Sequence, residues 1–337
     1  MSCKQLMVGL FFSCIPFSGL EAQVPDSLKH YVYACLEVMQ KESLYASQLN
    51  WNNIRDSVNQ QLGMAKTLKE AESSVIWVFA QLKDHHGMYG GIDTTYRYQK
   101  PGPEREFSKG ILAEYQKPRS IRIRMLANGI AYYKMPAVLI GSNQEKMKQW
   151  ANMLTDSLCK LETQHPRGYI VDLRMNNGGN SEPMWQALKD LIGEENHTYT
   201  ADANRKILPD ETDSVTVRYR MAALPDRPCS FQKHIPVAVL IGPGTASSGE
   251  IMALSFSTRR KTRLFGEPTI GVASVTNGFV IQEKGYLLLT VGYIANARKE
   301  ILSSYYIQPD VFVKSDDNYS EPEKDVTVQA ALKWLNQ

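Results

Sequence analysis

The sequence has few cysteines, little net charge and, beyond its first residues, no long apolar run. Its five cysteines form no CxxC pair, which argues against a zinc site and against a disulfide framework. Cys35 and Cys159 lie in apolar helical patterns and are expected to be small buried hydrophobes. Lysine and arginine total 38 against 35 aspartates and glutamates, so the formal charge of +3 predicts no nucleic-acid partner. Without repeats or low-complexity tracts, the 337 residues can form one large or two medium domains.

The N-terminal residues have the pattern of an export signal. Lys4 supplies a positive charge, Leu6 to Phe17 form an apolar stretch too short to span a bilayer, and Ala22 is a small residue at the cleavage position. We therefore predict a signal peptide over residues 1–22 and export to the periplasm or the extracellular space. A lipoprotein signal ending at Cys14 fits poorly, because bulky aromatic residues precede it. No integral membrane segment is expected after signal removal.

The apolar periodicity changes along the chain. Residues 25–84 are helical in pattern, whereas 89–119 predict irregular chain with at most a short strand around Ile111 and Leu112. Beyond them we expect strands over 121–126, 129–135, 168–173, 236–241 and 262–265, helices over 147–161, 184–192, 250–257 and 326–335, and a hairpin of 278–282 with 286–294. Alternating strands and helices predict an α/β fold with a largely parallel sheet. The predicted organisation is a helical N-terminal segment over 23–90, an irregular connector over 91–120 and a core over 121–337.

A turn of small residues follows the apolar run from Ile235 to Ile241. Residues 242–250, Gly-Pro-Gly-Thr-Ala-Ser-Ser-Gly-Glu, present Ser247 and Ser248 where a helix begins. Free N–H groups and the helix dipole stabilise a developing oxyanion there. Several unrelated hydrolases expose a nucleophilic serine on such a turn. The alternative is a Ser/Gly-rich loop that only caps the helix.

Gly178 and Gly179 occupy a second strand–turn–helix junction, after the strand expected over 168–173. Without a Cβ, glycine lets backbone N–H groups face an open space. Two such turns at the carboxyl ends of neighbouring parallel strands would bring donors and a serine to one crevice. A phosphate cradle is the competing interpretation, but no Walker lysine follows either turn.

A serine nucleophile needs a base, and one histidine motif is a candidate. Asp84-His85-His86-Gly87 ends a helix and then turns, whereas the other four histidines lie in helical, proline-flanked or polar loop contexts. Adjacent histidines at a helix end point in different directions, and no third ligand is evident. We therefore expect neither a metal nor a cofactor.

Together these segments resemble the tail-specific protease family: the carboxyl-terminal processing proteases, the tricorn core protease and the interphotoreceptor retinoid-binding protein repeats. Five ordered segments resemble the family's "LxDxH", "DLRxNxGG", serine, "GEPTxG" and "GIxPD" motifs, namely Leu82–His86, Ile170–Gly179, Val239–Glu250, Gly266–Gly271 and Ile307–Asp310. The likeness runs from about Trp51 to Val313. It implies a Clp-protease/crotonase-type β-α superhelical core.

The resemblance also implies roles for individual residues. Ser247 falls on the family nucleophile, and the N–H groups of Ser248 and of Gly178 or Gly179 fall on the oxyanion hole. His86 matches the histidine base of the tricorn-like branch.

The sequence departs from the family's pattern at three places. Val272 stands where the processing proteases have their lysine base, which excludes a Ser-Lys dyad. The glutamate of the tricorn-like branch falls on Ser303. The stretch between His86 and Gly129 is too short for the usual PDZ insertion, which suggests a PDZ-less bacterial branch.

Four residues are candidates for orienting the base or the serine turn. Glu250 matches a supporting acid of the processing proteases, and Glu267, Asp84 and Ser303 are the other three. The sequence does not choose among them.

We therefore predict an exported serine peptidase of the endopeptidase type that acts on peptide or protein substrates. Ser247 would attack the scissile carbonyl, and His86 would take its proton and return it to the leaving amine. Two alternatives stay open. One is a non-catalytic binder of peptides or apolar ligands on the same fold, and the other is an esterase-type acyl hydrolase using the same serine.

Overall fold

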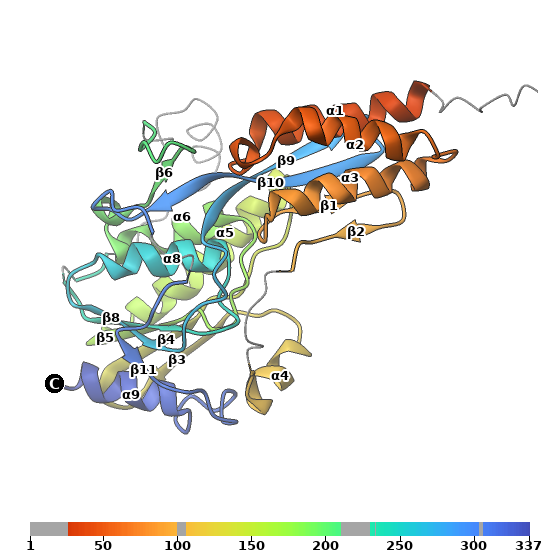
Figure 1. Ribbon diagram of the computed structural model, residues 1–337. Coiled ribbons are helices and arrows are strands. Elements are labelled where there is room, and N and C mark those ends of the chain that lie inside the picture. Colours follow the sequence, from red (N-terminus) through yellow and green to blue (C-terminus); the bar gives the residue numbers. More distant parts are fainter. Residues whose placement is uncertain (1–25, 100–105, 210–229, 233, 303–305) are drawn as a thin grey trace, which may run out of the picture.

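The computed structural model describes residues 26–99, 106–209, 230–232, 234–302 and 306–337. The predicted signal peptide and Ser303 lie outside the described residues. The centre is a six-stranded sheet in the order β11-β8-β7-β5-β4-β3, in which only β3 is antiparallel to its neighbour (Figure 1). Its strands are β3 (Arg122–Leu126), β4 (Ile130–Lys134), β5 (Gly168–Asp172), β7 (Val237–Ile241), β8 (Thr262–Gly266) and β11 (Val311–Phe312).

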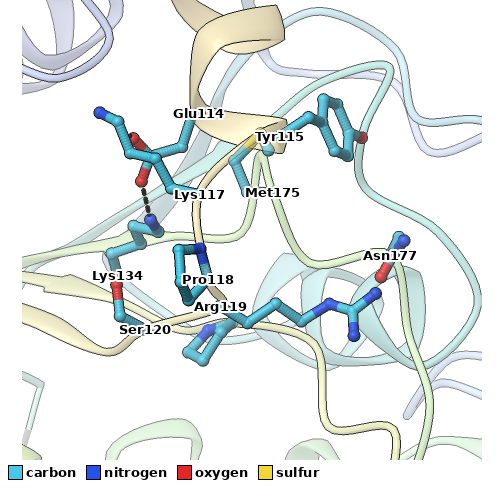
Figure 2. Close-up of a pocket in the computed structure, with 10 residues that line it drawn as sticks. Glu114, Tyr115, Lys117, Pro118, Arg119, Ser120, Lys134, Met175 and Asn177 are labelled. Atoms are coloured by element: carbon cyan, nitrogen blue, oxygen red, sulfur yellow. Dashed lines mark hydrogen bonds and ion pairs between the residues drawn. The ribbon is translucent and has the colours of Figure 1, made fainter.

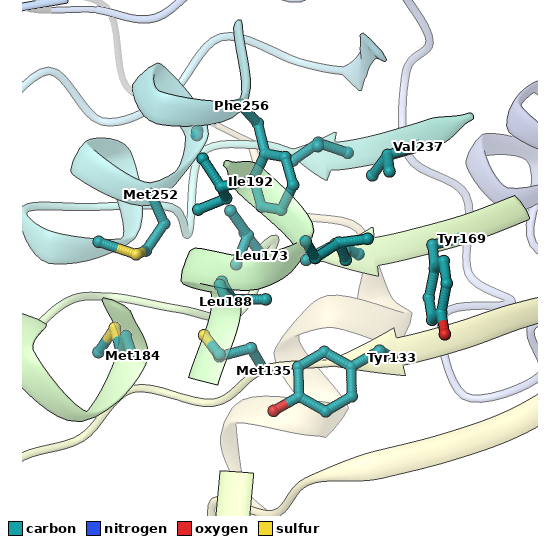
Figure 3. Close-up of a cluster of buried hydrophobic side chains, with 14 of the residues drawn as sticks. Tyr133, Met135, Tyr169, Leu173, Met184, Leu188, Ile192, Val237, Met252 and Phe256 are labelled. Atoms are coloured by element: carbon teal, nitrogen blue, oxygen red, sulfur yellow. The ribbon is translucent and has the colours of Figure 1, made fainter. Parts of the chain in front are cut away.

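Helices cover both faces of this sheet and form two apolar layers (Figure 1). The first layer comes from α5 (Gln144–Glu162), α6 (Ser181–Ile192) and α8 (Ser248–Ser257). Figure 3 shows its side chains, among them Tyr133, Leu188 and Phe256, between helices and strands. The second layer is closed by α9 (Val326–Leu335), through Val328 and Ala331. Because both faces are covered, a strand such as β7 is buried at every residue, which explains its continuous apolar sequence.

A second, antiparallel sheet pairs strands that are far apart in the sequence, in the order β2-β1-β10-β6 with β9 paired to β10. Its strands are β1 (Met88–Gly90), β2 (Thr95–Tyr96), β6 (Tyr199–Ala201), β9 (Ser274–Ile281) and β10 (Gly285–Ala295). Three N-terminal helices lie on it: α1 (Asp26–Glu42), α2 (Trp51–Leu62) and α3 (Leu68–Leu82). The short 3-10 helices are Ala46–Gln48, Ala127–Gly129 and Glu194–Asn196.

A buried ion network fixes the end of β5. The Arg174 guanidinium donates to both carboxylate oxygens of Asp172 and lies 2.8 Å from a carboxylate oxygen of Asp325. The same Asp325 carboxylate caps α9 by accepting from the N–H of Thr327 and Val328. Removing one partner of such a buried pair typically costs about 3–5 kcal/mol, because the other charge is left uncompensated. The turn that follows β5 therefore starts from a fixed point.

The expected helices and strands of the core are confirmed, but the prediction for 89–119 is wrong. This stretch contains β2 and a helix, α4 (Lys109–Tyr115), in place of a strand around Ile111 and Leu112. Ser108 caps the helix by accepting from the N–H of Ile111. Ile111 and Glu114, three residues apart on one helix face, are both buried. Capping and helical spacing thus outweigh the strand preference of a β-branched residue.

The prediction for the cysteines is half correct. Cys35 is free and buried, as expected. Cys159 is disulfide-bonded, so its interpretation as an unpaired buried hydrophobe is wrong. It lies half-buried beside Leu158, at the edge of the apolar stripe of α5, and helical periodicity does not say what approaches that edge.

Within the described ranges, no helix combines the length and the apolar character needed to cross a membrane. The division of the chain at residues 90 and 120 stays a prediction, and the β1–β10 pairing crosses it.

Candidate active site

Ser247 lies on the tight turn between β7 and α8. Its backbone, at φ 51° and ψ −119°, is in a region that residues other than glycine rarely adopt. The turn rests on the neighbouring β5–α6 turn, because the N–H of Ala246 donates to the carbonyl of Asn176 at 3.0 Å. This adjacency follows from the parallel pairing of β5 with β7, which brings their carboxyl ends to one edge.

A buried carboxylate holds the serine turn from inside. Glu250 accepts the N–H of Ser247 at 2.9 Å, the hydroxyl of Thr269, and the N–H groups of Gly271 and Val272 at 2.9 and 3.0 Å. Burial raises the pKa of Glu250 to about 6, although these four hydrogen bonds favour the ionised form. The carboxylate therefore carries its charge at neutral pH.

The segment that carries His86 is anchored to β10, about two hundred residues further along the chain. After α3 ends at Leu82, with Lys83 as its C-cap, the Asp84 carboxylate accepts the N–H of His86 and Gly87. It also accepts the N–H and the hydroxyl of Thr290 on β10, both at 2.8 Å. The Asp84 carboxylate thus shapes the backbone of the turn. Among the described residues it makes no hydrogen bond to the imidazole ring of His86.

The His86 ring lies between two hydroxyls. Its Nε2 is 3.1 Å from the Oγ of Ser247, and its Nδ1 is 2.7 Å from the Oγ of Ser274, residues 161 and 188 positions away in sequence. In the tautomer with the proton on Nδ1, the ring donates to Ser274 and turns its Nε2 lone pair toward Ser247. Burial lowers the pKa of His86 to about 4, and the charge of Asp84 opposes this shift.

Sequence reasoning missed Ser274. The sequence offered one sign of its role, a hydroxyl two residues after Val272 in the segment that follows the "GEPTxG" motif. Nothing local to the sequence connects it with a histidine 188 positions away.

The two glycines of the β5–α6 turn differ in their hydrogen bonding. The N–H of Gly178 donates to the Asn176 side chain at 3.0 Å. Across the described part of the chain, the N–H groups of Gly179 and Ser248 have no hydrogen-bond acceptor. The Ser248 hydroxyl donates to the carbonyl of Gly179 at 2.6 Å and so ties the two turns together. Gly179 and Ser248 are therefore the open donors beside Ser247.

The remaining sequence candidates lie outside this contact set. Glu267 accepts the N–H of Ser315 at 3.1 Å. His85 Nε2 lies 3.2 Å from the carbonyl of Gly271 rather than beside Ser247. Ser303 falls in a range that the structure does not describe. The described residues hold no group of three or more His, Cys, Asp or Glu side chains placed to bind a metal ion.

Comparison with known proteins identifies the class. Residues 129–313, more than half of the chain, match Peptidase family S41, and the protein belongs to this family. It is therefore a serine-type peptidase with peptide or protein substrates, and the predicted fold class and family resemblance are confirmed. The matched range includes Ser247 and the glycine turn, whereas His86 precedes it.

The chain is similar to the nisin-resistance protein of Lactococcus lactis subsp. lactis, with 23% identity over 91% of this chain and 93% of the relative. It is 30% identical to the carboxyl-terminal-processing protease of Synechocystis sp., over 53% of this chain but only 39% of that protein. Among solved structures, a lipoprotein from Streptococcus agalactiae superposes with a TM-score of 0.71 at 21% identity, covering 93% of this chain and 97% of the other.

The glycine turn leads to a prediction about stability and turnover. A Cβ on Gly178 (φ 97°) would lie 2.7 Å from the Cβ of Ser247, and one on Gly179 (φ 102°) would overlap the Val138 carbonyl oxygen. Gly178→Ala and Gly179→Ala should each lower the free energy of unfolding by about 1–3 kcal/mol through backbone strain alone, and more through overlap. Turnover per folded molecule should fall as well.

Gly141→Ala is the matched control, because Gly141 also has a positive φ (60°) but nothing lies within 4 Å of its Cβ position. Urea unfolding and turnover, measured on all three variants, check the prediction. Normal turnover per folded molecule in both turn variants would mean that the turn is scaffold only.

Proposed function

We propose that the protein is an exported endopeptidase in which Ser247 is the nucleophile and His86 the general base. The distance of 3.1 Å between His86 Nε2 and Ser247 Oγ carries this proposal. Such a contact is within hydrogen-bond reach, and the base has its lone pair toward the hydroxyl when Ser274 accepts from Nδ1.

The proposed reaction passes through an acyl-enzyme. His86 takes the Ser247 proton as Oγ attacks the peptide carbonyl, and the N–H groups of Gly179 and Ser248 stabilise the oxyanion. The imidazolium then protonates the leaving amine, and a water activated by His86 hydrolyses the ester. Gly178 is left out of the oxyanion hole because its N–H is already committed to Asn176.

Ser274 is proposed as a positioning residue that holds the ring and its tautomer. Since a hydroxyl is neutral, it offers the imidazolium no charge stabilisation, in keeping with a His86 pKa lowered to about 4. Glu250 is proposed to hold the nucleophile's backbone, and Asp84 to hold the backbone of the base. Each acts through another residue.

The contact between His86 and Ser247 favours an enzyme over a non-catalytic binder, because ligand binding alone does not require a base beside a serine hydroxyl. The esterase-type alternative uses the same pair and differs only in the leaving group. Family membership favours peptide bonds.

Ser247→Ala should abolish turnover of a casein or peptide substrate while leaving the unfolding midpoint near that of the unmodified protein. Loss of a nucleophile typically costs several orders of magnitude in rate. Ser248→Ala is the matched comparison, because it keeps the backbone donor and loses only the side-chain bond to Gly179, worth about 1 kcal/mol. Labelling by a fluorophosphonate probe should disappear in Ser247→Ala alone. Unchanged turnover in Ser247→Ala would refute the serine mechanism.

The pH dependence of kcat/KM should show a base with a low pKa. His86 must be neutral to accept a proton, so activity should be level near neutral pH and fall as pH drops through about 4. Ser274→Asp places a carboxylate beside Nδ1, which should raise the pKa of His86 and so move the acidic limb of the profile upward by roughly 1–3 pH units. Ser274→Ala should lower kcat and leave the acidic limb at the same low pH as in the unmodified protein.

Profiles measured with an uncharged peptide test this assignment. A limb that stays fixed in Ser274→Asp would contradict the contact between Ser274 and the base. A fixed limb near pH 6 would belong to Glu250.

Export is proposed from the N-terminal sequence, and a disulfide at Cys159 suits an oxidising compartment. In the native host, the mature protein should be found outside the cytoplasm. Its N-terminal sequence should begin at Gln23. A cytoplasmic protein that retains residues 1–22 would rule this out.

A further inference from the structure

A basic pocket adjoins the proposed nucleophile. It is a cavity of about 310 Å³ between α4, the segment that follows it, and the β5–α6 turn (Figure 2). Tyr115 and Arg119 come from the α4 side, Lys134 from the end of β4, and Met175 and Asn177 from the turn.

Two of the residues that line this pocket lie next to the serine turn or to its neighbour. Asn177 directly precedes Gly178, whose Cβ position lies 3.2 Å from the Ser247 Oγ. A Cβ added to Gly244, on the serine turn itself, would lie 2.6 Å from the Tyr115 hydroxyl, so Tyr115 packs against that turn. An extended peptide advances about 3.3 Å per residue, so a substrate group within a few residues of the scissile bond can reach the pocket.

The charge of the pocket is positive. Among the described residues that line it, the one carboxylate is Glu114, which is shared by Lys117 at 3.0 Å, Arg122 at 3.1 Å and Lys134. Burial alone would raise the pKa of Glu114, but these cations hold it below its ordinary value, so the group stays ionised. Three cations on one anion leave a positive field in the pocket.

Arg119 adds a positive charge that forms no ion pair with Glu114. No hydrogen bond or ion pair involves its guanidinium anywhere in the described ranges, and the Asn177 side chain is likewise unpaired there. Figure 2 shows the guanidinium extending toward Asn177, away from the Glu114 cluster. A planar guanidinium binds a carboxylate with two parallel hydrogen bonds, which an uncharged group cannot match.

We propose that this pocket is a substrate subsite that binds a carboxylate, with Arg119 and Asn177 as its ligands. The inference rests on the proposed peptidase function. The carboxylate belongs either to an aspartate or glutamate side chain or to the free C-terminus of the substrate peptide. Both present the same anion to Arg119.

Four peptides, matched around one scissile bond, separate these sources. One pair differs by glutamate against glutamine, and the other by a free carboxyl against a carboxamide terminus. In the unmodified protein one pair should show at least about tenfold higher kcat/KM for the carboxylate, the scale of a charge-assisted hydrogen bond. Arg119→Gln should bring that ratio close to one.

Arg298→Gln is the control for loss of one exposed positive charge, since Arg298 lies outside this pocket and should leave the ratio unchanged. Equal kcat/KM within both pairs, with turnover still abolished by Ser247→Ala, would overturn the subsite and leave the peptidase function standing. If none of the four is cleaved, fluorescence anisotropy with Ser247→Ala decides the matter. Carboxylate and amide peptides that bind equally well would then overturn the proposal.

Discussion

The arrangement of the site depends on one buried carboxylate, that of Glu250. It gathers the backbone of Ser247 and the loop from Thr269 to Val272 around itself. That loop leads into β9, which begins at Ser274, the partner of the His86 ring. An unpaired buried charge costs several kcal/mol, so the four donors have to converge. Their convergence fixes the spacing between Ser247, the proposed nucleophile, and Ser274, which is proposed to orient the base.

Burial also reverses the usual order in which the two ionisable groups titrate. It raises the pKa of Glu250 to about 6 and lowers that of His86 to about 4. In water a glutamate loses its proton well before an imidazolium does. Here both shifts have the same cause, the removal of solvent from the groups, and at neutral pH the carboxylate is charged while the imidazole is neutral. These are the protonation states that the proposed roles require: a charged Glu250 to accept hydrogen bonds and a neutral His86 to accept a proton.

The sequence was sufficient where local pattern and spatial position coincide. Fully apolar strands indicated the parallel sheet, and the small residues after two of them indicated the turns that carry Ser247 and Gly179. It was insufficient where contact depends on distant pairing. The strand β1 has only three residues, too few to show an alternation of apolar and polar side chains. Its partner β10 begins almost two hundred residues later. The contact between Ser274 and His86 depends on that pairing and was missed for the same reason.

The β1–β10 pairing also sets the order in which the site is completed. Asp84, which shapes the turn under His86, is bonded to Thr290, and only the last part of the chain follows that residue. While the protein is being synthesised, the segment carrying Ser247 emerges before the strand that brings the histidine to it. A nascent chain therefore holds Ser247 before the histidine that is proposed as its base lies beside it. The geometry of the proposed site arises only when β10 has paired with β1.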